Sequence, residues 1–281
     1  MHDIAKTSLD FTINSGQVFL WDKVGDTWHG INGDELIVIQ EPFRIISEEK
    51  PALRLFRSDD NLTAIMSQIG RDSRVRRAAK LFPGLRLLRQ DPFQCYISFI
   101  CSSNSSIQNI RNMLKRLCSK FGSRIEYGGT CFFSFPRPER LASATPKDLL
   151  SCGLGFRARY VKKAALAVSS GRINLEDIRT ADYAKALEAL KSVPGIGNKI
   201  ADCILLFSLD KMESFPIDRW TQRILQKYYP NVFEGAGGRS LTEKKYSRLH
   251  EKIVEYFGPY AGYSQQFLFK LERDLNQKNW L

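Results

Sequence analysis

The sequence has little of what metal-binding and membrane proteins depend on. Its three histidines stand far apart at positions 2, 29 and 250, which does not suit a zinc site. Its cysteines lack the close group of four thiols that ligates an iron–sulfur cluster; they stand at positions 95, 101, 118, 131, 152 and 203. No apolar run reaches the roughly 18 residues of a membrane-spanning helix, and the N-terminus has no secretory signal pattern. We therefore expect an intracellular protein with reduced, buried thiols.

Positive charge is what the sequence does have. Its 42 lysines and arginines exceed its 30 acidic residues, for a net charge of +12 and a pI near 9.5. Such a balance indicates a polyanionic partner, and charge alone does not separate nucleic acid from an acidic membrane. With 281 residues, 43% of them hydrophobic, the chain can build one large domain or two to three smaller ones.

The hydrophobic pattern changes along the chain from a strand period to a helix period. Between residues 8 and 48, β-rich runs alternate with Gly-containing turns, which predicts a small antiparallel sheet. The runs are residues 9–13, 18–24, 27–31, 35–40 and 43–47. From about residue 51 the pattern is helical, and short helices over 60–68 and 71–81 are expected to cover one face of the sheet.

The rest of the chain is predicted to be mostly helical. Asp91 followed by Pro92 marks the start of a buried helix. The expected helices are residues 92–101, 107–121, 146–150, 158–169, 181–193, 218–228, 241–256 and 260–276, with one more starting near residue 198. The predicted fold class is α+β, with an antiparallel sheet domain over residues 1–90 and a two-lobed helical region over 91–281.

One stretch of the helical region has the pattern of an anion-binding hairpin. An amphipathic run ends at Val193, a tight turn follows, and the next helix begins near Asn198. Gly195 and Gly197 allow the chain to turn sharply and leave backbone N–H groups bare at a helix N-terminus. In a basic protein the expected anion is a DNA phosphate.

A lysine and an aspartate follow this turn at helix starts. Lys199 stands in the first turn of one helix, and Asp218 has the N-cap position of the next. The first helix rises roughly 15 Å at ~1.5 Å per residue. The loop after it can span up to about 26 Å at ~3.3 Å per residue, so Asp218 can return beside Lys199. A lysine nucleophile with a carboxylate partner suits covalent chemistry at an electrophilic carbon.

These residues resemble a helix–hairpin–helix motif, at about residues 182–209, from a superfamily of DNA glycosylases. Lys199 and Asp218 match its bifunctional members. Four further stretches resemble one family, the 8-oxoguanine DNA glycosylase/AP lyases that carry an N-terminal sheet domain. The resemblance runs from about residue 9 to residue 275, and the lack of cluster-binding cysteines argues against the endonuclease III branch.

Two of the four stretches imply a pocket for the base. A Ser-Gly-Gln-x-Phe-x-Trp segment places Gly16 where a family glycine carbonyl accepts the hydrogen that oxidised guanine carries on N7. In a C-terminal helix, Gln265 would read the Watson–Crick edge and Phe269 would stack on the base. Cys203, four residues past Lys199, would line the opposite side. The simpler alternatives are an ordinary turn at Gly16 and core packing for Phe269 and Cys203.

The other two stretches imply contacts with DNA around an extruded base. Asn104 would fill the gap in the duplex and pair with the orphaned cytosine. Phe156 would wedge the base stack, and Arg157 would donate to the cytosine; the simpler alternative for this loop is a surface turn. Two positions depart from the family. Asn109 replaces an arginine that helps to read cytosine, and Trp220 replaces a histidine that contacts a phosphate.

The resemblance implies a mechanism on double-stranded DNA that contains oxidised guanine. The protein, expected to be a monomer, would flip the base out of the duplex. Lys199 would attack the sugar C1′ while Asp218 stabilises the cationic sugar, and the resulting Schiff base would permit β-elimination. No cofactor or metal is required. Two alternatives stay open: a monofunctional glycosylase for alkylated bases, and a non-catalytic DNA-binding protein.

Overall fold

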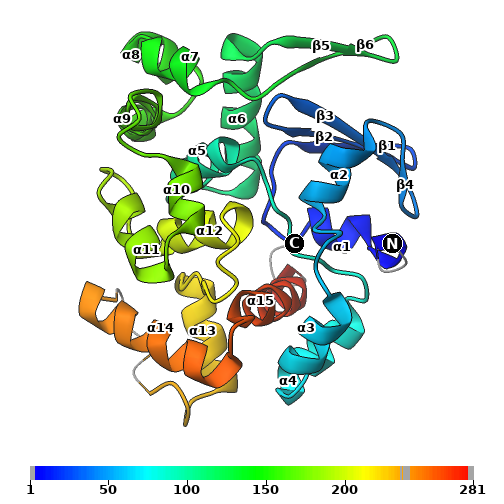
Figure 1. The fold of residues 1–281 in the computed structure, drawn as a ribbon, viewed down its shortest axis with the longest axis vertical. Helices are drawn as coiled ribbons and strands as arrows, with labels where there is room; N and C mark the ends of the chain where they lie inside the picture. The colour runs from blue at the N-terminus through cyan, green and yellow to red at the C-terminus, as the bar shows by residue number, and fades with distance from the viewer. Residues whose placement is uncertain (1–3, 235, 237–240, 278–281) are drawn as a thin grey trace.

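The computed structural model describes residues 4–234, 236 and 241–277 of the chain. Its N-terminal part holds a four-stranded antiparallel sheet in the order β1-β2-β3-β4 (Figure 1). The strands are β1 (Trp21–Val24), β2 (Thr27–Asn32), β3 (Glu35–Gln40) and β4 (Arg44–Ile45). Gly25 and Gly33, at φ +61° and +64°, close the first two hairpins with tight turns. The predicted sheet is confirmed.

Two short helices cover one face of this sheet, α1 (Leu9–Ile13) and α2 (Glu49–Leu55). Their apolar side chains form a core with Trp28, Ile37 and Ile39 of the strands. Residues on the opposite side, Leu20 and Ile31 among them, join the larger core of the helical region instead. The sheet is therefore packed on both faces and forms a fixed support for the loop that precedes it.

The first predicted strand is a helix. Residues 9–13 are β-rich in composition, yet they form α1, because the Ser8 hydroxyl accepts a hydrogen bond from the Phe11 N–H at 3.2 Å and caps a helical turn. The runs at 18–24 and 43–47 contain only the shorter strands β1 and β4. A local cap outweighs β propensity here.

The next two helices exist as predicted but do not cover the sheet. They are α3 (Leu62–Ile69) and α4 (Ser73–Leu81), and both pack against the C-terminal helix α15 (Ala261–Gln277), as Figure 1 shows. Their buried residues belong to the helical core rather than to the core under the sheet. The predicted contact is wrong because the apolar stripe of each helix fits α15.

The remaining elements make up the helical region. They are α5 (Pro92–Cys101), α6 (Ile107–Phe121), a hairpin of β5 (Arg124–Tyr127) and β6 (Thr130–Phe133), α7 (Pro138–Ser143), α8 (Pro146–Ser151), α9 (Ala158–Ser169), α10 (Leu175–Thr180), α11 (Tyr183–Lys191), α12 (Asn198–Ser208), α13 (Arg219–Tyr228) and α14 (Glu243–Phe257). Short 3₁₀ turns lie at Ile4–Lys6 and Gly155–Arg157.

Helices α5 and α12 form the centre of the helical region. Every residue of α5 after its first proline is buried, as its lack of a polar face predicts. α12 packs directly on it, and the rings of Phe99 and Phe207 stack at 5.5 Å between centroids. Lys199 lies in the first turn of α12, so a buried helix pair holds its backbone rigid.

An ionic cluster joins the residues around the sheet to the helical region. Asp210, just after α12, accepts ion pairs from Arg57 and Arg89 at 2.8 Å and from Arg179 at 2.7 Å. The Arg57 side chain is fully buried, so its charge is stabilised by this carboxylate rather than by water. The cluster fixes the position of the sheet relative to α12.

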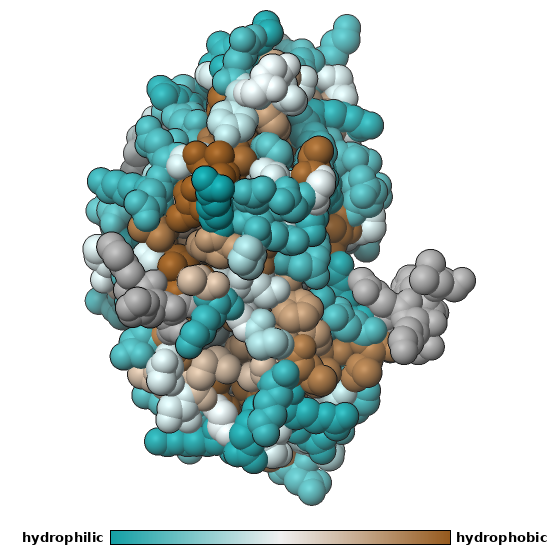
Figure 2. All heavy atoms as spheres, turned by 90° about the vertical axis from the view of Figure 1, so that its right-hand side faces the viewer, coloured by the Kyte–Doolittle hydropathy of each residue, from teal (hydrophilic) through white to brown (hydrophobic). Residues whose placement is uncertain are grey.

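The surface on the sheet side is largely hydrophilic, with apolar side chains in scattered patches (Figure 2). The cationic side chains in and just before α4 are exposed to solvent, as expected for a solvated face; they are Arg71, Arg74, Arg76, Arg77 and Lys80. The cysteines are unpaired thiols, and five are buried; Cys131 on β6 is exposed, so the expectation of burial is wrong for it. Among the described helices, none could span a bilayer. The described residues contain no cluster of acidic, histidine and cysteine side chains suited to a metal.

Candidate active site

The predicted hairpin connects α11 to α12 through a turn that requires glycine. Gly195 has φ +97°, and a Cβ there would come within 2.5 Å of the Tyr160 ring. Gly197 is the N-cap of α12 and offers no side chain to the amides of the first helical turn. Those N–H groups therefore stay available to an anion, as predicted.

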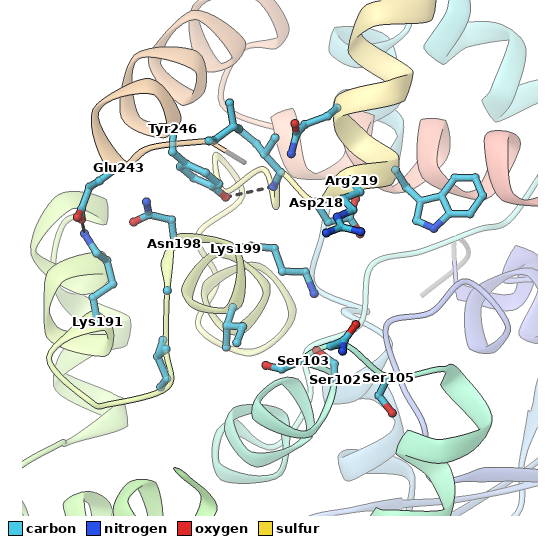
Figure 3. A pocket seen from close by; sticks show the side chains of 18 of the residues that line it. Ser102, Ser103, Ser105, Lys191, Asn198, Lys199, Asp218, Arg219, Glu243 and Tyr246 are labelled. Carbon is cyan, nitrogen blue, oxygen red and sulfur yellow. Dashed lines mark hydrogen bonds and ion pairs between the residues drawn. The ribbon is translucent and has the colours of Figure 1, made fainter. Parts of the chain in front are cut away.

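Asp218 caps the next helix as predicted. Its Oδ1 accepts a hydrogen bond from the Thr221 N–H at 2.8 Å, at the start of α13. The loop from α12 brings it back toward Lys199, and the two side chains line the same two cavities. Figure 3 shows the Lys199 amine reaching into the space between Asp218 and the segment that carries Ser102 and Ser105.

A buried carboxylate connects the elements that carry Lys199 and Asp218. Asp202, one turn after Lys199, accepts hydrogen bonds from the hydroxyls of Tyr183 at 2.7 Å and Tyr246 at 2.5 Å. Burial raises the pKa of Asp202 to about 7. The Tyr246 oxygen in turn accepts the Ile217 N–H at 3.1 Å, directly before Asp218. Asp202 thus links α11, α12 and α14, and Tyr246 links α14 to the loop that positions Asp218.

The larger cavity is a polar groove of about 1160 Å³. It is bordered by residues 102–106, by the head of α12 and by the head of α13. Its lining is rich in amides, hydroxyls and charged groups, including Asn104, Asn198 and Lys191. Figure 3 shows Lys191, Asn198 and Lys199 at the border of an open space. Such a groove suits a hydrated, charged backbone better than a flat base.

The smaller cavity, of about 460 Å³, is mainly apolar and lies in the range of small-molecule sites, ~300–1,000 Å³. Its apolar wall comes from four separate parts of the chain; the residues are Phe19, Phe99, Ile107, Ile110 and Phe269. Lys199, Asp218 and Trp220 line both this cavity and the groove. The Lys199 amine lies 5.6 Å from the centre of the Phe99 ring, at the junction of the two spaces.

Gly16 lines the apolar cavity, on a loop that α15 holds in place. Its φ is +85°, and a Cβ there would meet Nη1 of Arg273 at 3.2 Å and the Phe269 ring at 3.4 Å. The Gln266 amide donates to the Ser15 carbonyl at 3.0 Å. Both backbone conformation and close packing therefore require a glycine at this position.

Gln17 is a supporting residue that sequence reasoning did not assign. Its side chain is fully buried, and its amide nitrogen donates to the carbonyls of Thr12 at 3.1 Å and Arg86 at 2.8 Å. Its amide oxygen accepts the Leu88 N–H at 2.8 Å. The signal available was a polar residue inside an otherwise apolar run next to Gly16.

Gln265 and Cys203 lie close to the cavity without lining it. Gln265 is buried; its Nε2 is 3.5 Å from the Thr221 hydroxyl, and its Oε1 has no hydrogen-bond partner among the described residues. Burial raises the pKa of the Cys203 thiol to about 12, in the electrostatic field of Lys199 and Asp218. Of the four predicted pocket residues, the structure brings Gly16 and Phe269 to the cavity surface.

The predicted DNA-wedging residues lie together, and Asn104 among them lines the groove. Asn104 is exposed and has φ +49°, a left-handed conformation that asparagine tolerates. The Arg157 guanidinium donates to the carbonyls of Ser103, at 2.5 and 2.9 Å, and Asn104, at 2.9 Å. Phe156 next to it is 52% exposed. Arg157 therefore holds the Asn104 backbone, and its donors are engaged with protein carbonyls.

The two positions that depart from the family face these cavities. Asn109 lines the groove and also a smaller cavity of about 310 Å³, which it shares with Asn104, Arg116 and Arg157. Trp220 borders both main cavities, and the Arg223 guanidinium lies 5.3 Å from its ring centre.

Two known protein families match most of this chain. Residues 97–252 match the HhH-GPD superfamily of base excision DNA repair proteins, and residues 2–96 match the N-terminal domain of 8-oxoguanine DNA glycosylases. The chain belongs to this superfamily, in its 8-oxoguanine glycosylase branch. The predicted family and enzyme class, an N-glycosylase and DNA lyase, are thereby confirmed.

Individual relatives agree with this placement. The chain is 30% identical to an N-glycosylase/DNA lyase of Arabidopsis thaliana, over 94% of the chain and 77% of that protein. It is 29% identical to the 8-oxoguanine glycosylase/lyase of Clostridium acetobutylicum, solved with double-stranded DNA that carries cytosine opposite 8-oxoguanine; the TM-score is 0.85, over 96% of this chain and 93% of that one. A 3-methyladenine DNA glycosylase of Archaeoglobus fulgidus shares the fold at 20% identity, with a TM-score of 0.74 over 97% and 95% of the two chains.

Proposed function

We propose that the protein excises 8-oxoguanine from double-stranded DNA and then cleaves the strand at the vacated site. The observation that carries this proposal is the position of Lys199 and Asp218, which border a polar groove on one side and an apolar cavity on the other. A nucleophile at that junction can reach the sugar of a nucleotide whose phosphates lie in the groove and whose base lies in the cavity.

The groove holds the DNA backbone. The uncapped amides at the head of α12 bind a phosphate, and the basic surface contributes a salt-dependent attraction. Phe156 wedges the base stack, and Asn104, held by Arg157, fills the gap left by the extruded nucleotide. Extrusion costs a few kcal/mol, which these contacts offset.

The cavity receives the base. Phe269 supplies an aromatic face, and the Gly16 carbonyl accepts the N7 hydrogen that 8-oxoguanine has and guanine lacks. Contact between the base and Gln265 or Cys203 requires the cavity to open further, since neither lines it in this structure. The unpartnered Oε1 of Gln265 is an acceptor that such a contact would satisfy.

The reaction starts with the Lys199 amine. Its Nζ forms a bond to C1′ as the C1′–N9 bond breaks, and the bonding electrons leave with the base. The Asp218 carboxylate, held in place by the Thr221 N–H, stabilises the positive charge on the sugar. The sugar ring then opens to a Schiff base on Lys199. Loss of a C2′ proton expels the 3′ phosphate and cleaves the strand.

The decisive assay is excision from duplexes that carry 8-oxoguanine opposite each of the four bases. Duplexes with guanine or 3-methyladenine at the same position are the controls. We expect excision and strand cleavage only when the duplex carries 8-oxoguanine. We also expect the protein to act as a monomer on DNA inside the cell. Release of 3-methyladenine without strand cleavage would support the alkylated-base alternative, and DNA binding without release of any base would support a non-catalytic role.

A further inference from the structure

Arg273 belongs to the same face of α15 as the predicted pocket residues. Gln265, Phe269 and Arg273 are spaced four residues apart, which aligns their side chains along one stripe of a helix. Arg273 lines the apolar cavity together with Phe269 and Gly16. Its Nη1 lies 3.2 Å from the position that a Cβ on Gly16 would take. A guanidinium nitrogen therefore lies beside Gly16, the residue whose carbonyl is the predicted contact for N7.

One nitrogen of this guanidinium is buried without a partner in the described part of the chain. Its Nη1 is buried without a hydrogen-bond acceptor among the described residues, and burial lowers the pKa of the Arg273 side chain. The neighbouring carboxylate, Asp274, pairs with Lys270 at 2.9 Å. Glu272 is the other charged residue of α15 that lines the cavity, and it does have a protein partner. Both of its carboxylate oxygens accept hydrogen bonds from Lys227 at 3.0 Å. A buried, unpartnered donor in a ligand cavity indicates that the ligand brings the acceptor.

The chemistry of the oxidised base supplies that acceptor. In 8-oxoguanine the O8 carbonyl lies between the N7 hydrogen and N9, the atom bonded to the sugar. A base whose N7 hydrogen faces Gly16 therefore presents O8 near the same loop. When the C1′–N9 bond breaks, the electron pair on N9 is conjugated with O8, so negative charge develops on that oxygen.

We propose that Arg273 donates a hydrogen bond to O8 of the extruded base and stabilises the anion that leaves. This inference rests on the proposed function. Lys199 forms the new bond to C1′, the electron pair of the broken C1′–N9 bond spreads from N9 to O8, and Arg273 contacts that oxygen. The proton that the amine gives up neutralises the free base afterwards. The apolar walls strengthen the interaction because they exclude water.

The test separates release of the base from cleavage of the strand. Arg273→Met removes the charge at similar length, Arg273→Lys keeps a cation, and Arg44→Met alters an exposed arginine on β4 as the matched control. Single-turnover excision is measured on an 8-oxoguanine duplex, and β-elimination is measured on a duplex with a preformed abasic site. The abasic duplex has no base to release, so only a contact with the base affects the two assays differently.

We expect Arg273→Met to slow excision about 100-fold, the scale for losing one donor to a developing negative charge. The rate of abasic-site cleavage should stay within about threefold of wild type. Arg273→Lys should excise the base roughly tenfold faster than Arg273→Met. The proposal would be overturned by a parallel loss in both assays or by an unchanged excision rate. Equal excision rates in Arg273→Lys and Arg273→Met would also overturn it. If Arg273→Met does not fold, Arg273→Lys alone must show slowed excision with normal abasic-site cleavage. Wild-type protein inactive in both assays would refute the proposed function instead.

Discussion

The groove and the apolar cavity meet at one lysine, yet they are built from different kinds of residue. Amides, hydroxyls and charged groups border the groove of about 1160 Å³. Phenylalanines and isoleucines border the cavity of about 460 Å³. The difference matches the two halves of a nucleotide, a charged backbone and a flat apolar base. Recognition and chemistry are therefore separable here, because Lys199 and Asp218 line both spaces and most other lining residues line only one.

The largest effect is expected at the junction. Lys199→Gln should lower both excision and strand cleavage by at least about 10⁴-fold, because it removes the nucleophile of both steps. Binding of the damaged duplex should change little, since the groove is preserved. Lys185→Gln, at an exposed lysine on α11, is the control. Strand cleavage that persists in Lys199→Gln would show that another residue is the nucleophile.

A second change at the junction isolates charge from structure. Asn is as good an N-cap as Asp, so Asp218→Asn keeps the cap on α13 while it removes the carboxylate. Excision should fall about 10²–10³-fold with thermal stability nearly unchanged. Asp218→Ala should in addition lose about 1 kcal/mol of unfolding free energy. If Asp218→Asn excised the base at the wild-type rate, Asp218 would act only as a helix cap.

A third change affects the cavity alone. Gly16→Ala places a methyl group against Arg273 and Phe269 in a backbone conformation that costs about 1–3 kcal/mol. Excision should fall about 10–100-fold, while cleavage at a preformed abasic site remains, because that step needs no base pocket. The two activities are compared under single-turnover conditions.

The matched control for that change is Gly25→Ala. Gly25 has a similar positive φ of +61°, but a Cβ added to it in the β1–β2 turn would meet nothing within 4 Å. Denaturant unfolding should show comparable losses of stability in the two variants, and only Gly16→Ala should lose excision. Equal excision rates in Gly16→Ala and Gly25→Ala would show that Gly16 is not part of the base pocket.

A fourth change affects the loop that is expected to wedge the base stack. Phe156→Ala removes the exposed ring expected to wedge the base stack, and it should weaken binding of the damaged duplex about tenfold. Cleavage of bound abasic DNA should be nearly normal. Leu150→Ala, at another exposed apolar side chain, is the control. Unchanged affinity in Phe156→Ala would favour the simpler surface-turn interpretation of its loop.

The smallest effect concerns the opposite base. With Asn109 in place of the family arginine, we expect excision rates opposite the four bases to lie within about tenfold of one another. Asn109→Arg should widen the preference for cytosine, because a guanidinium donates to the acceptors of that base. A strong cytosine preference in the wild type would contradict this expectation.

Much of the fold was predictable because its helices carry explicit caps. Asp91 accepts the Gln94 N–H at 2.7 Å and Ser106 accepts the Asn109 N–H at 3.2 Å, and both helices begin where the sequence predicted. The six-residue helices α7 and α10 were missed, although α8, of the same length, was predicted. The packing of α3 and α4 on α15 is a tertiary choice that local patterns do not encode.

The site was predictable only in part. Spacing along one segment was enough to pair Lys199 with Asp218. Gly16 was proposed through resemblance, since nearly the whole chain separates it from Phe269, which it meets in space. Arg273 was missed because it stands in a charged run typical of a solvated helix face. Its spacing from Phe269 was the signal that could have identified it.

Covalent trapping tests the central claim most directly. Wild-type protein and a duplex with 8-oxoguanine are mixed with borohydride, and the trapped adduct is digested and mapped by mass spectrometry. A Schiff base formed at the junction of the groove and the cavity predicts one adduct, on the peptide that carries Lys199. Absence of an adduct, or an adduct on a different residue, would contradict the account.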